Sequence, residues 1–279
     1  MTETGEVPPG VDPTRPTAAR LYDYILGGTN NFPADREVAE KMKADFPDTV
    51  DAVLSNRGFH GRAAAWMARQ GVRQFIDLGS GLPTQNNTHE SVRRVIPDAR
   101  VVYVDIDPMV AAHAAGLLGS DGGTVVITAD LREPDVVLSQ PDLLKLINVG
   151  EPAGVLVTSV LHVIPDSSDP WGLVARYMAA MADGSYLALS HGTRDKLPPR
   201  QINDITDTLA KSAINVYQRS RAEVERFFRG LELVPPYEGA KPGVAYAGLW
   251  GAEDPQAADS DGSRAFYCGV ARRPKGFSA

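Results

Sequence analysis

Three aspartates stand where apolar runs of the sequence end, and the first lies beside a glycine turn. Asp77 lies inside the run 75–78, Asp105 ends the run 101–105, and Asp130 follows the run 124–129. Gly79 and Gly81 come directly after the first run, and because glycine has no Cβ atom a ligand can approach the backbone there. Such a turn leads into a helix whose first N–H groups point outward. The spacing therefore predicts a nucleotide-type site.

The kind of nucleotide follows from the residues around the turn. Asp105 lies 24 residues after Gly81, close to the roughly 20 expected for a carboxylate that binds ribose hydroxyls. A dinucleotide fingerprint needs glycine or alanine at its sixth position, where this chain has Thr84 after Pro83, so a nicotinamide oxidoreductase is disfavoured. Carboxylates repel a pyrophosphate but suit an ammonium, an adenine amine and ribose hydroxyls. S-adenosylmethionine (SAM) carries all three and is the predicted ligand; the alternative is that each aspartate caps a helix or turn.

The composition is that of an ordinary globular protein. The chain has 279 residues, 43% hydrophobic and 23% charged, which suits one large α/β domain with a sizeable core. Its net charge of −7 gives no general attraction for nucleic acid or an anionic membrane, so neither is an expected partner. Cys268 is the only cysteine, residues 1–17 lack the apolar core of a signal peptide, and no metal-ligand cluster is evident. We therefore expect a cytoplasmic protein without a metal.

The N-terminal quarter of the chain is predicted to form a helical cap. Residues 1–14 are rich in proline and glycine and are expected to be a disordered lead-in. Residues 15–71 form the predicted cap or lid, with a helix over 17–26 that Gly27 and Gly28 end, a second helix from Pro33, and a third that is interrupted near Gly58.

From residue 72 the hydrophobic pattern changes to short apolar runs that alternate with amphipathic stretches of helical length. This alternation is typical of a parallel sheet covered on both faces. Strands are predicted near 74–78, 101–105, 124–129, 154–159, 185–190, 231–235 and 265–271, and helices near 87–95, 108–118, 134–147, 170–182, 198–217 and 221–229. Residues 72–279 are therefore predicted to be a single Rossmann-like α/β core.

These features look like a class I SAM-dependent methyltransferase, and further motifs resemble one actinobacterial family, formerly catalogued as a domain of unknown function. The motifs lie at 19–28, 31–36, 56–57, 75–84, 161–162, 184–187, 190–191 and 227–233. The resemblance covers residues 15–235 and the final strand, whereas residues 237–264 depart from the short pattern of the family. It implies a seven-stranded, mostly parallel sheet with helices on both faces, SAM as cofactor and S-adenosylhomocysteine (SAH) as product.

The resemblance also implies where the methionine part of SAM would lie. Gly79, Ser80 and Gly81 would pass close to it. Asp77 would bind the ammonium group directly or through a water, and Ser159 would close the site near the sulfonium. Positioning of the acceptor and exclusion of water are then what the protein must supply, because the sulfonium already carries the reactivity.

The adenosine part is assigned in the same way. Asp105 would accept hydrogen bonds from the ribose hydroxyls, and Ile106 would pack against the adenine ring. Asp130 would accept a hydrogen bond from the adenine amine, and Leu131 would flank the ring. Cofactor recognition would therefore follow three consecutive strand ends.

Two interpretations remain for each of the residues that would meet the acceptor. His162 is either a general base that takes a proton from an acceptor oxygen or nitrogen, or a loop histidine bonded to the backbone. Tyr22, Tyr24, Asn31 and Arg36 either contact substrate and cofactor as part of a lid over residues 22–36 or form a hydrogen-bonded hinge.

The loop after the fourth strand narrows the class of acceptor. Residues 159–162 lack the Asp/Asn-Pro-Pro-aromatic sequence of adenine- and cytosine-amino methyltransferases, and no nucleophilic cysteine or glutamate pair stands there. The predicted function is O- or N-methylation of a small molecule. The alternative is a non-catalytic regulatory protein that binds SAM or SAH.

Overall fold

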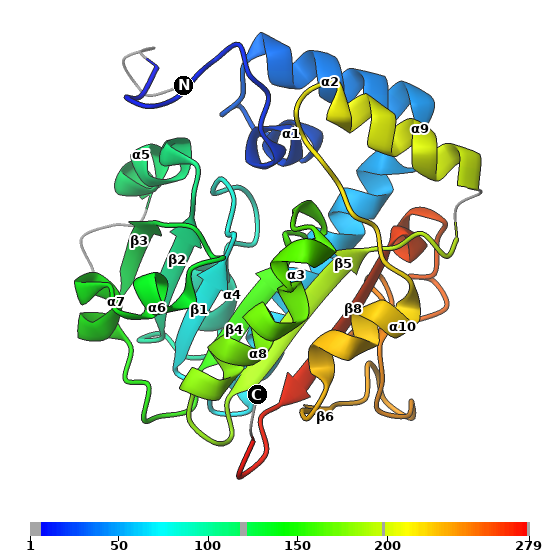
Figure 1. The fold of residues 1–279 in the computed structure, drawn as a ribbon. Coiled ribbons are helices and arrows are strands. Elements are labelled where there is room, and N and C mark those ends of the chain that lie inside the picture. The colour runs from blue at the N-terminus through cyan, green and yellow to red at the C-terminus, as the bar shows by residue number, and fades with distance from the viewer. Residues whose placement is uncertain (1–6, 118–121, 197–198, 278–279) are drawn as a thin grey trace.

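The computed structural model describes residues 7–117, 122–196 and 199–277, and it is built around one twisted sheet with helices on both faces (Figure 1). The strands are β1 Gln74–Leu78, β2 Arg100–Asp105, β3 Thr124–Thr128, β4 Gly154–Thr158, β5 Tyr186–Gly192, β6 Glu232–Leu233, β7 Ala245–Tyr246 and β8 Phe266–Arg272. Their order is β3-β2-β1-β4-β5-β8-β6, with β7 also paired to β8. The first five strands are parallel and β8 is antiparallel to β5. The two-residue β7 makes eight strands instead of the predicted seven.

The helices fill the intervals between the strands as the sequence pattern predicts, with shorter bounds in places. They are α1 Ala18–Ile25, α2 Pro33–Asp45, α3 Thr49–Arg69, α4 Thr88–Arg93, α5 Pro108–Leu117, α6 Pro134–Leu138, α7 Pro141–Leu146, α8 Pro170–Ala180, α9 Pro199–Ala210 and α10 Arg221–Glu225. The single helix expected over 134–147 is two helices. Pro141 has no N–H group, so it cannot donate the backbone hydrogen bond that would continue α6, and it starts α7 instead.

The sheet has a separate apolar core on each face. Side chains alternate along a strand, so Ile76 and Leu78 of β1 pack with Leu173 and Tyr177 of α8, whereas Phe75 packs on the opposite face with α3. Figure 1 shows α8 in front of the sheet, with α3 passing behind it. Asp77 shares the face of Phe75, which points its carboxylate toward α3 and α4.

The predicted interruption of the third helix near Gly58 is wrong. The helix runs without a break from Thr49 to Arg69, and its second half packs on the sheet through Phe59 and Met67. A Cβ atom at Gly61 would lie 3.3 Å from Ser91 Oγ, so glycine lets α4 approach closely. Helices α1, α2 and α9 lie above the sheet in Figure 1, and Val53 in the first half of α3 packs into the same apolar cluster.

The expectation of a disordered lead-in also differs from the structure where residues are described. Residues 1–6 lie outside the described part of the chain. From residue 7 onward the segment has a defined position, with Val11 packed against Phe32, Leu82 and Met109. Arg20 Nη2 donates to the Asp12 carbonyl (3.3 Å), and this bond fixes the segment to α1.

The segment 237–264 covers the far side of α3. Arg62 donates to the carbonyls of Trp250 (2.7 Å) and Ala247 (2.8 Å), and Ser260 Oγ donates to Asp51 Oδ2 (2.5 Å). Among the described residues, no helix is long and apolar enough to span a membrane. Within the same ranges, no group of three or more acidic, histidine or cysteine side chains is arranged to hold a metal ion.

Candidate functional site

A cavity of about 910 Å³ opens at the carboxyl ends of β1, β2, β3 and β4. This is where α/β sheets bind their ligands, and the volume lies in the range of small-molecule sites. Its walls come from the residues that follow those strands, from α3, from the loop after β4, and from the segments 10–22 and 213–217. The cavity therefore joins the predicted strand-end residues to the segments 10–22 and 213–217, which lie far from them in the sequence.

The two glycines of the turn have different roles. Both have left-handed backbone angles, with φ of +68° at Gly79 and +64° at Gly81. A Cβ atom at Gly79 would lie 2.4 Å from the Val160 side chain, whereas one at Gly81 would meet no atom within 4 Å. Gly79 thus makes room for packing inside the protein, and Gly81 alone leaves open space next to the cavity.

Asp105 is held in place by the turn that it faces. Its Oδ2 accepts from the Gly81 N–H (2.8 Å) and its Oδ1 from the Asp107 N–H (2.9 Å). Burial raises the pKa of this carboxyl, and the two backbone donors oppose that effect. Carboxylate oxygens have further lone pairs, so Asp105 can accept from ligand hydroxyls without losing these bonds.

The residues expected around an adenine ring line the same cavity. Ile106 exposes 61% of its surface, a large exposure for an isoleucine, and it borders the cavity next to Asp105. Leu131 lies across from it, and the Leu131 carbonyl accepts from Tyr177 Oη (2.8 Å). Asp130 is less free, because both of its oxygens accept from Arg132, and this pairing lowers the pKa of the carboxyl.

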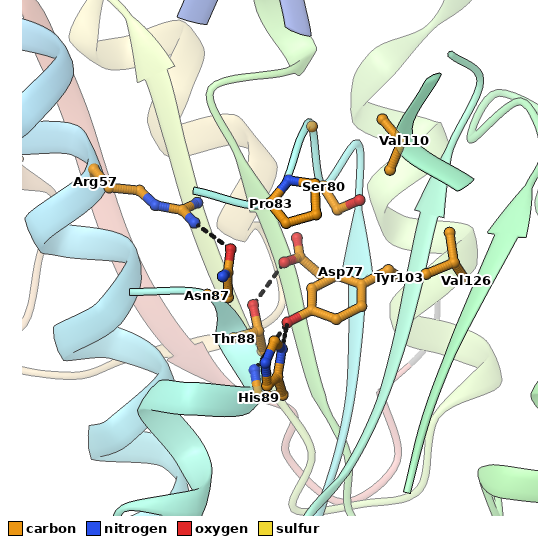
Figure 2. Close-up of a pocket in the computed structure, with 11 residues that line it drawn as sticks. Arg57, Asp77, Ser80, Pro83, Asn87, Thr88, His89, Tyr103, Val110 and Val126 are labelled. Carbon is orange, nitrogen blue, oxygen red and sulfur yellow. Dashed lines mark hydrogen bonds between the residues drawn. The ribbon is translucent and has the colours of Figure 1, made fainter. Parts of the chain in front are cut away.

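Asp77 lines a small cavity next to the large one, with one oxygen unused. Its Oδ2 accepts from Thr88 Oγ1 (2.6 Å), and its buried Oδ1 has no partner among the described residues. Burial raises the pKa of Asp77 to about 6. Figure 2 shows Asp77 beside Ser80 in a small cavity of about 10 Å³, which has room for about one water molecule. The unused oxygen suits an ammonium, bound directly or through a water.

His60, left unassigned in the sequence, belongs to this end of the site. Its Nε2 lies 2.8 Å from Thr88 Oγ1 and its Nδ1 lies 2.9 Å from Thr158 Oγ1. Thr88 gives its hydroxyl proton to Asp77, so His60 must donate from Nε2 and accept from Thr158 at Nδ1. Burial lowers the pKa of His60 well below its usual range, so the ring is neutral. A hydrogen-bonded chain therefore links Asp77 to the end of β4.

The end of β4 turns sharply into the acceptor side of the cavity. Ser159 has a left-handed φ of +55°, an uncommon angle for a residue with a side chain, and its N–H donates to Ser190 Oγ (3.0 Å). A 3₁₀ turn, η1 Leu161–Val163, follows and carries His162 to the cavity wall. Ser159 thus lines the cavity at the point where the chain leaves β4, and its place near a sulfonium stays a prediction.

His162 is a half-buried ring whose Nδ1 is buried and unsatisfied. Its Nδ1 has no hydrogen-bond partner in the described part of the chain. Its ring centroid lies 5.9 Å from that of His191 and 6.2 Å from that of Phe266. Burial lowers the pKa of His162 to about 4, so it is neutral and can accept a proton. The buried Arg219 holds the loop by donating to the carbonyls of Leu161 (3.0 Å) and Ile164 (2.8 Å).

The predicted lid residues divide between the two interpretations. Tyr22 lines the cavity, and its hydroxyl accepts from Asn56 Nδ2 (2.8 Å). Asn31 Oδ1 accepts from Arg36 Nε (2.7 Å), and Tyr24 Oη donates to Glu40 (2.8 Å); none of Asn31, Arg36 and Tyr24 lines the cavity. These three have the contacts of a hinge, and Tyr22 alone is placed to contact a ligand.

The segment that does cover the cavity begins earlier, at residue 10. Residues 10–20 line it, and Thr17 Oγ1 donates to Asp107 Oδ2 (2.9 Å). The fully buried Arg20 pairs with Asp35 (3.1 Å), which ties the segment to α2. Its proline-rich sequence gave no signal of this role.

Comparisons with known proteins agree on one family. A model of the S-adenosyl methyltransferase family matches residues 4–274, a span that includes the segment 237–264. No curated protein matches the chain.

Solved structures are similar over nearly the whole chain. A candidate methyltransferase from Thermobifida fusca is 38% identical with a TM-score of 0.87, and the match covers 96% of this chain and 98% of that one. A DUF574 family protein from Streptomyces avermitilis is 36% identical with a TM-score of 0.86, over 93% and 98% of the two chains. An O-methyltransferase family protein from Burkholderia thailandensis, 13% identical with a TM-score of 0.53 over 90% and 67%, shares the fold alone.

Proposed function

The chain belongs to the S-adenosyl methyltransferase family and is a SAM-dependent methyltransferase, and from that premise we propose that it methylates an oxygen or nitrogen of a small, uncharged organic acceptor. The observation that carries the proposal is the division of the cavity. Carboxylates at the ends of β2 and β3 line the cavity, Asp77 of β1 lies in the small cavity next to it, and the residues that follow β4 form an uncharged part of the wall. The family match leaves the non-catalytic regulator without support.

The carboxylate half fits SAM residue by residue. Ile106 offers an exposed apolar surface for the adenine ring, and Asp105 keeps lone pairs for the ribose hydroxyls. The open space at Gly81 admits the chain of the methionine, and the unused Oδ1 of Asp77 suits its ammonium. SAM, when bound, supplies an electrophilic methyl carbon on a sulfonium, so the protein need not activate the donor.

The acceptor half supports an uncharged ligand. Its wall is formed by Tyr22, Ile164, Ile214, Asn215 and Tyr217, together with the neutral ring of His162. A charged acceptor would lose its hydration on binding there and would gain no counter-ion, and this desolvation costs several kcal/mol. Aromatic and aliphatic side chains with a few hydroxyl and amide groups favour a mainly apolar molecule that carries one or two polar groups.

His162 is the residue proposed to accept the acceptor proton. Its ring lines the cavity and is neutral at pH 7, and Arg219 fixes the loop that carries it. Because Nδ1 is buried, Nε2 is the nitrogen proposed to meet the acceptor. The acceptor atom loses a proton as it gains a methyl group, so a nearby neutral imidazole removes the positive charge that would otherwise form.

The experiment is a search for the methylated product. The purified protein is incubated with deuteromethyl-labelled SAM and a cell extract that has been separated into small molecules and macromolecules. We expect the label in an uncharged small molecule by mass spectrometry, with none formed by the Gly81→Val variant. Label in the macromolecular fraction alone, or in a charged metabolite, would contradict the acceptor class.

A further inference from the structure

Arg57 is a buried charge that makes no ion pair, although it is near enough to Asp77 to oppose the rise in the pKa of that carboxyl. It leaves 8% of its surface exposed, and it lines both the large cavity and the small one beside Asp77. In the ranges that the structure describes, no carboxylate oxygen lies within 4 Å of its guanidinium. Its hydrogen bonds go to neutral oxygens instead. An unpaired buried cation is costly unless an anion binds to it.

The bonds that Arg57 does make leave one edge of the guanidinium available. Nε donates to the Gln85 carbonyl (2.6 Å) and Nη2 donates to Asn87 Oδ1 (2.9 Å), so both acceptors lie along the Nε–Nη2 edge. The guanidinium is planar and has five N–H groups. The other edge, formed by Nη1 and the second N–H of Nη2, is a two-donor fork that matches a carboxylate. Figure 2 shows the side chain fixed from α3 by its bond to Asn87.

The other arginines at the cavity are already paired or lie elsewhere. Arg20 is paired with Asp35 and Arg132 with Asp130, and Arg15 is exposed in the segment 10–20. Arg57 is therefore the one cation of the described cavity wall that is both buried and without an acidic partner.

Arg57 also lies next to Asp77, at one end of the row of three aspartates. The strand order β3-β2-β1 places Asp130, Asp105 and Asp77 in a row, and Arg57 lies beyond Asp77 on α3. A ligand with its adenine at the β3 end would bring its other end to a carboxylate and a guanidinium side by side. An α-amino acid carries an ammonium and a carboxylate on one carbon, which is the complementary pair.

We propose that Arg57 binds the carboxylate of the amino-acid end of SAM through its free Nη1–Nη2 edge. The inference rests on the proposed function, because it takes SAM as the ligand of the cavity. It makes Arg57 a residue that selects ligands with an intact amino acid over those that lack the carboxylate. Hydrogen bonds to charged groups predict that loss of the carboxylate weakens binding about ten- to a hundredfold.

The test compares three ligands by calorimetry: SAH, its decarboxylated analogue, which keeps the ammonium, and 5′-methylthioadenosine, which has no amino acid. The parent protein should bind SAH about ten- to a hundredfold more tightly than the decarboxylated analogue. In Arg57→Met this ratio should fall to about one, while the affinity for 5′-methylthioadenosine stays the same. Arg57→Lys, which keeps the charge without the fork, should give an intermediate ratio.

Arg62→Met is the matched control. Arg62 lies on the same helix and donates only to backbone carbonyls of the C-terminal segment, away from both cavities. The control should lose stability and keep the parental ratio, which circular dichroism and calorimetry would show.

The outcomes separate the two proposals. If the parent binds SAH but does not prefer it to the decarboxylated analogue, Arg57 has been misassigned while SAM binding stands; this comparison needs no variant. A preference for SAH that stays at the parental size in Arg57→Met also overturns the inference. If the parent binds none of the three ligands, the proposed cofactor site is wrong, and the assignment of Arg57 is lost with it.

Discussion

Replacement of Asp77 by asparagine should stabilise the protein without ligand and weaken its binding of SAH. Burial raises the pKa of Asp77 from 3.8 to about 6, because water no longer solvates the carboxylate. Asparagine has the same shape and can still accept from Thr88 Oγ1 through its amide oxygen. Its amide nitrogen would face the small cavity, where Ser80 Oγ also lacks a partner among the described residues.

The pKa difference sets the size and the pH window of the effect. A raised carboxyl pKa means that the folded state binds the extra proton, so stability is lost as the pH rises from 3.8 to about 6. The full penalty above that window is about 3 kcal/mol. Asp77→Asn removes it, so the melting temperature should rise on the order of 5 °C at pH 8 and should not change near pH 4.

Ligand binding should change in the opposite direction. Only the ionised carboxylate can pair with an ammonium, so the parent should bind SAH about tenfold more weakly at pH 5 than at pH 7. Asp77→Asn should bind SAH at least tenfold more weakly than the parent at pH 7, with little change between pH 5 and pH 7. Such an exchange of stability for binding is expected where a site is strained for function.

The assay is thermal unfolding from pH 4 to pH 8, with and without SAH, together with calorimetry at pH 5 and pH 7. Asp105 is also buried with a raised pKa, so it could add to a pH dependence of binding in the parent. The profile of Asp77→Asn separates the two groups, because Asp105 is still present in it. A variant that melts below the parent at pH 8, or that keeps the parental pH dependence of binding, would refute the reasoning.

Four further predictions concern other parts of the site. Asp105→Ala should lose about 1–3 kcal/mol of SAH affinity by calorimetry, because ribose hydroxyls would be left unpaired; equal affinity would remove the ribose assignment. Gly81→Val should abolish SAH binding while circular dichroism shows a folded protein, since the side chain would enter the open space at a left-handed position. His162→Phe should lower kcat about 10²- to 10⁴-fold with SAH affinity unchanged if His162 accepts the proton, and kcat should survive if the ring only packs. In hydrogen exchange, SAH should protect residues 10–20 and leave 22–36 unchanged; the reverse pattern would restore the lid first predicted for 22–36.

The strand-end half of the site was predictable because it is local in the sequence. An apolar run predicts a strand, and parallel strands bring their ends to one edge, so Asp77, Asp105 and Asp130 could be grouped without a structure. The sequence could not separate Gly79 from Gly81. Their difference depends on Val160, which reaches the turn from the loop after β4, a neighbour in space only.

The helical half was missed for a related reason. Arg57 and His60 lie three residues apart on α3, and their partners are 28 to 98 residues away along the chain. Which side chains of a helix face a ligand depends on how the helix crosses the sheet, and hydrophobic periodicity gives only the buried face. A usable signal was present, since Asn56 and His60 interrupt that face with polar groups at i, i+4 spacing, which is costly unless they are bonded.

The two halves of the cavity come from different parts of the chain. The proposed cofactor wall is made by residues between Asp77 and Arg132, with Arg57 and His60 added from α3, whereas the proposed acceptor wall is made by 158–165, 213–217 and the cap. Substitutions that share no partner change free energies almost independently. The acceptor wall can therefore vary among relatives of this chain while the row of carboxylates keeps the same cofactor. The chain of hydrogen bonds from Asp77 through Thr88 and His60 to Thr158 is where the two walls meet, so a change in it should alter both.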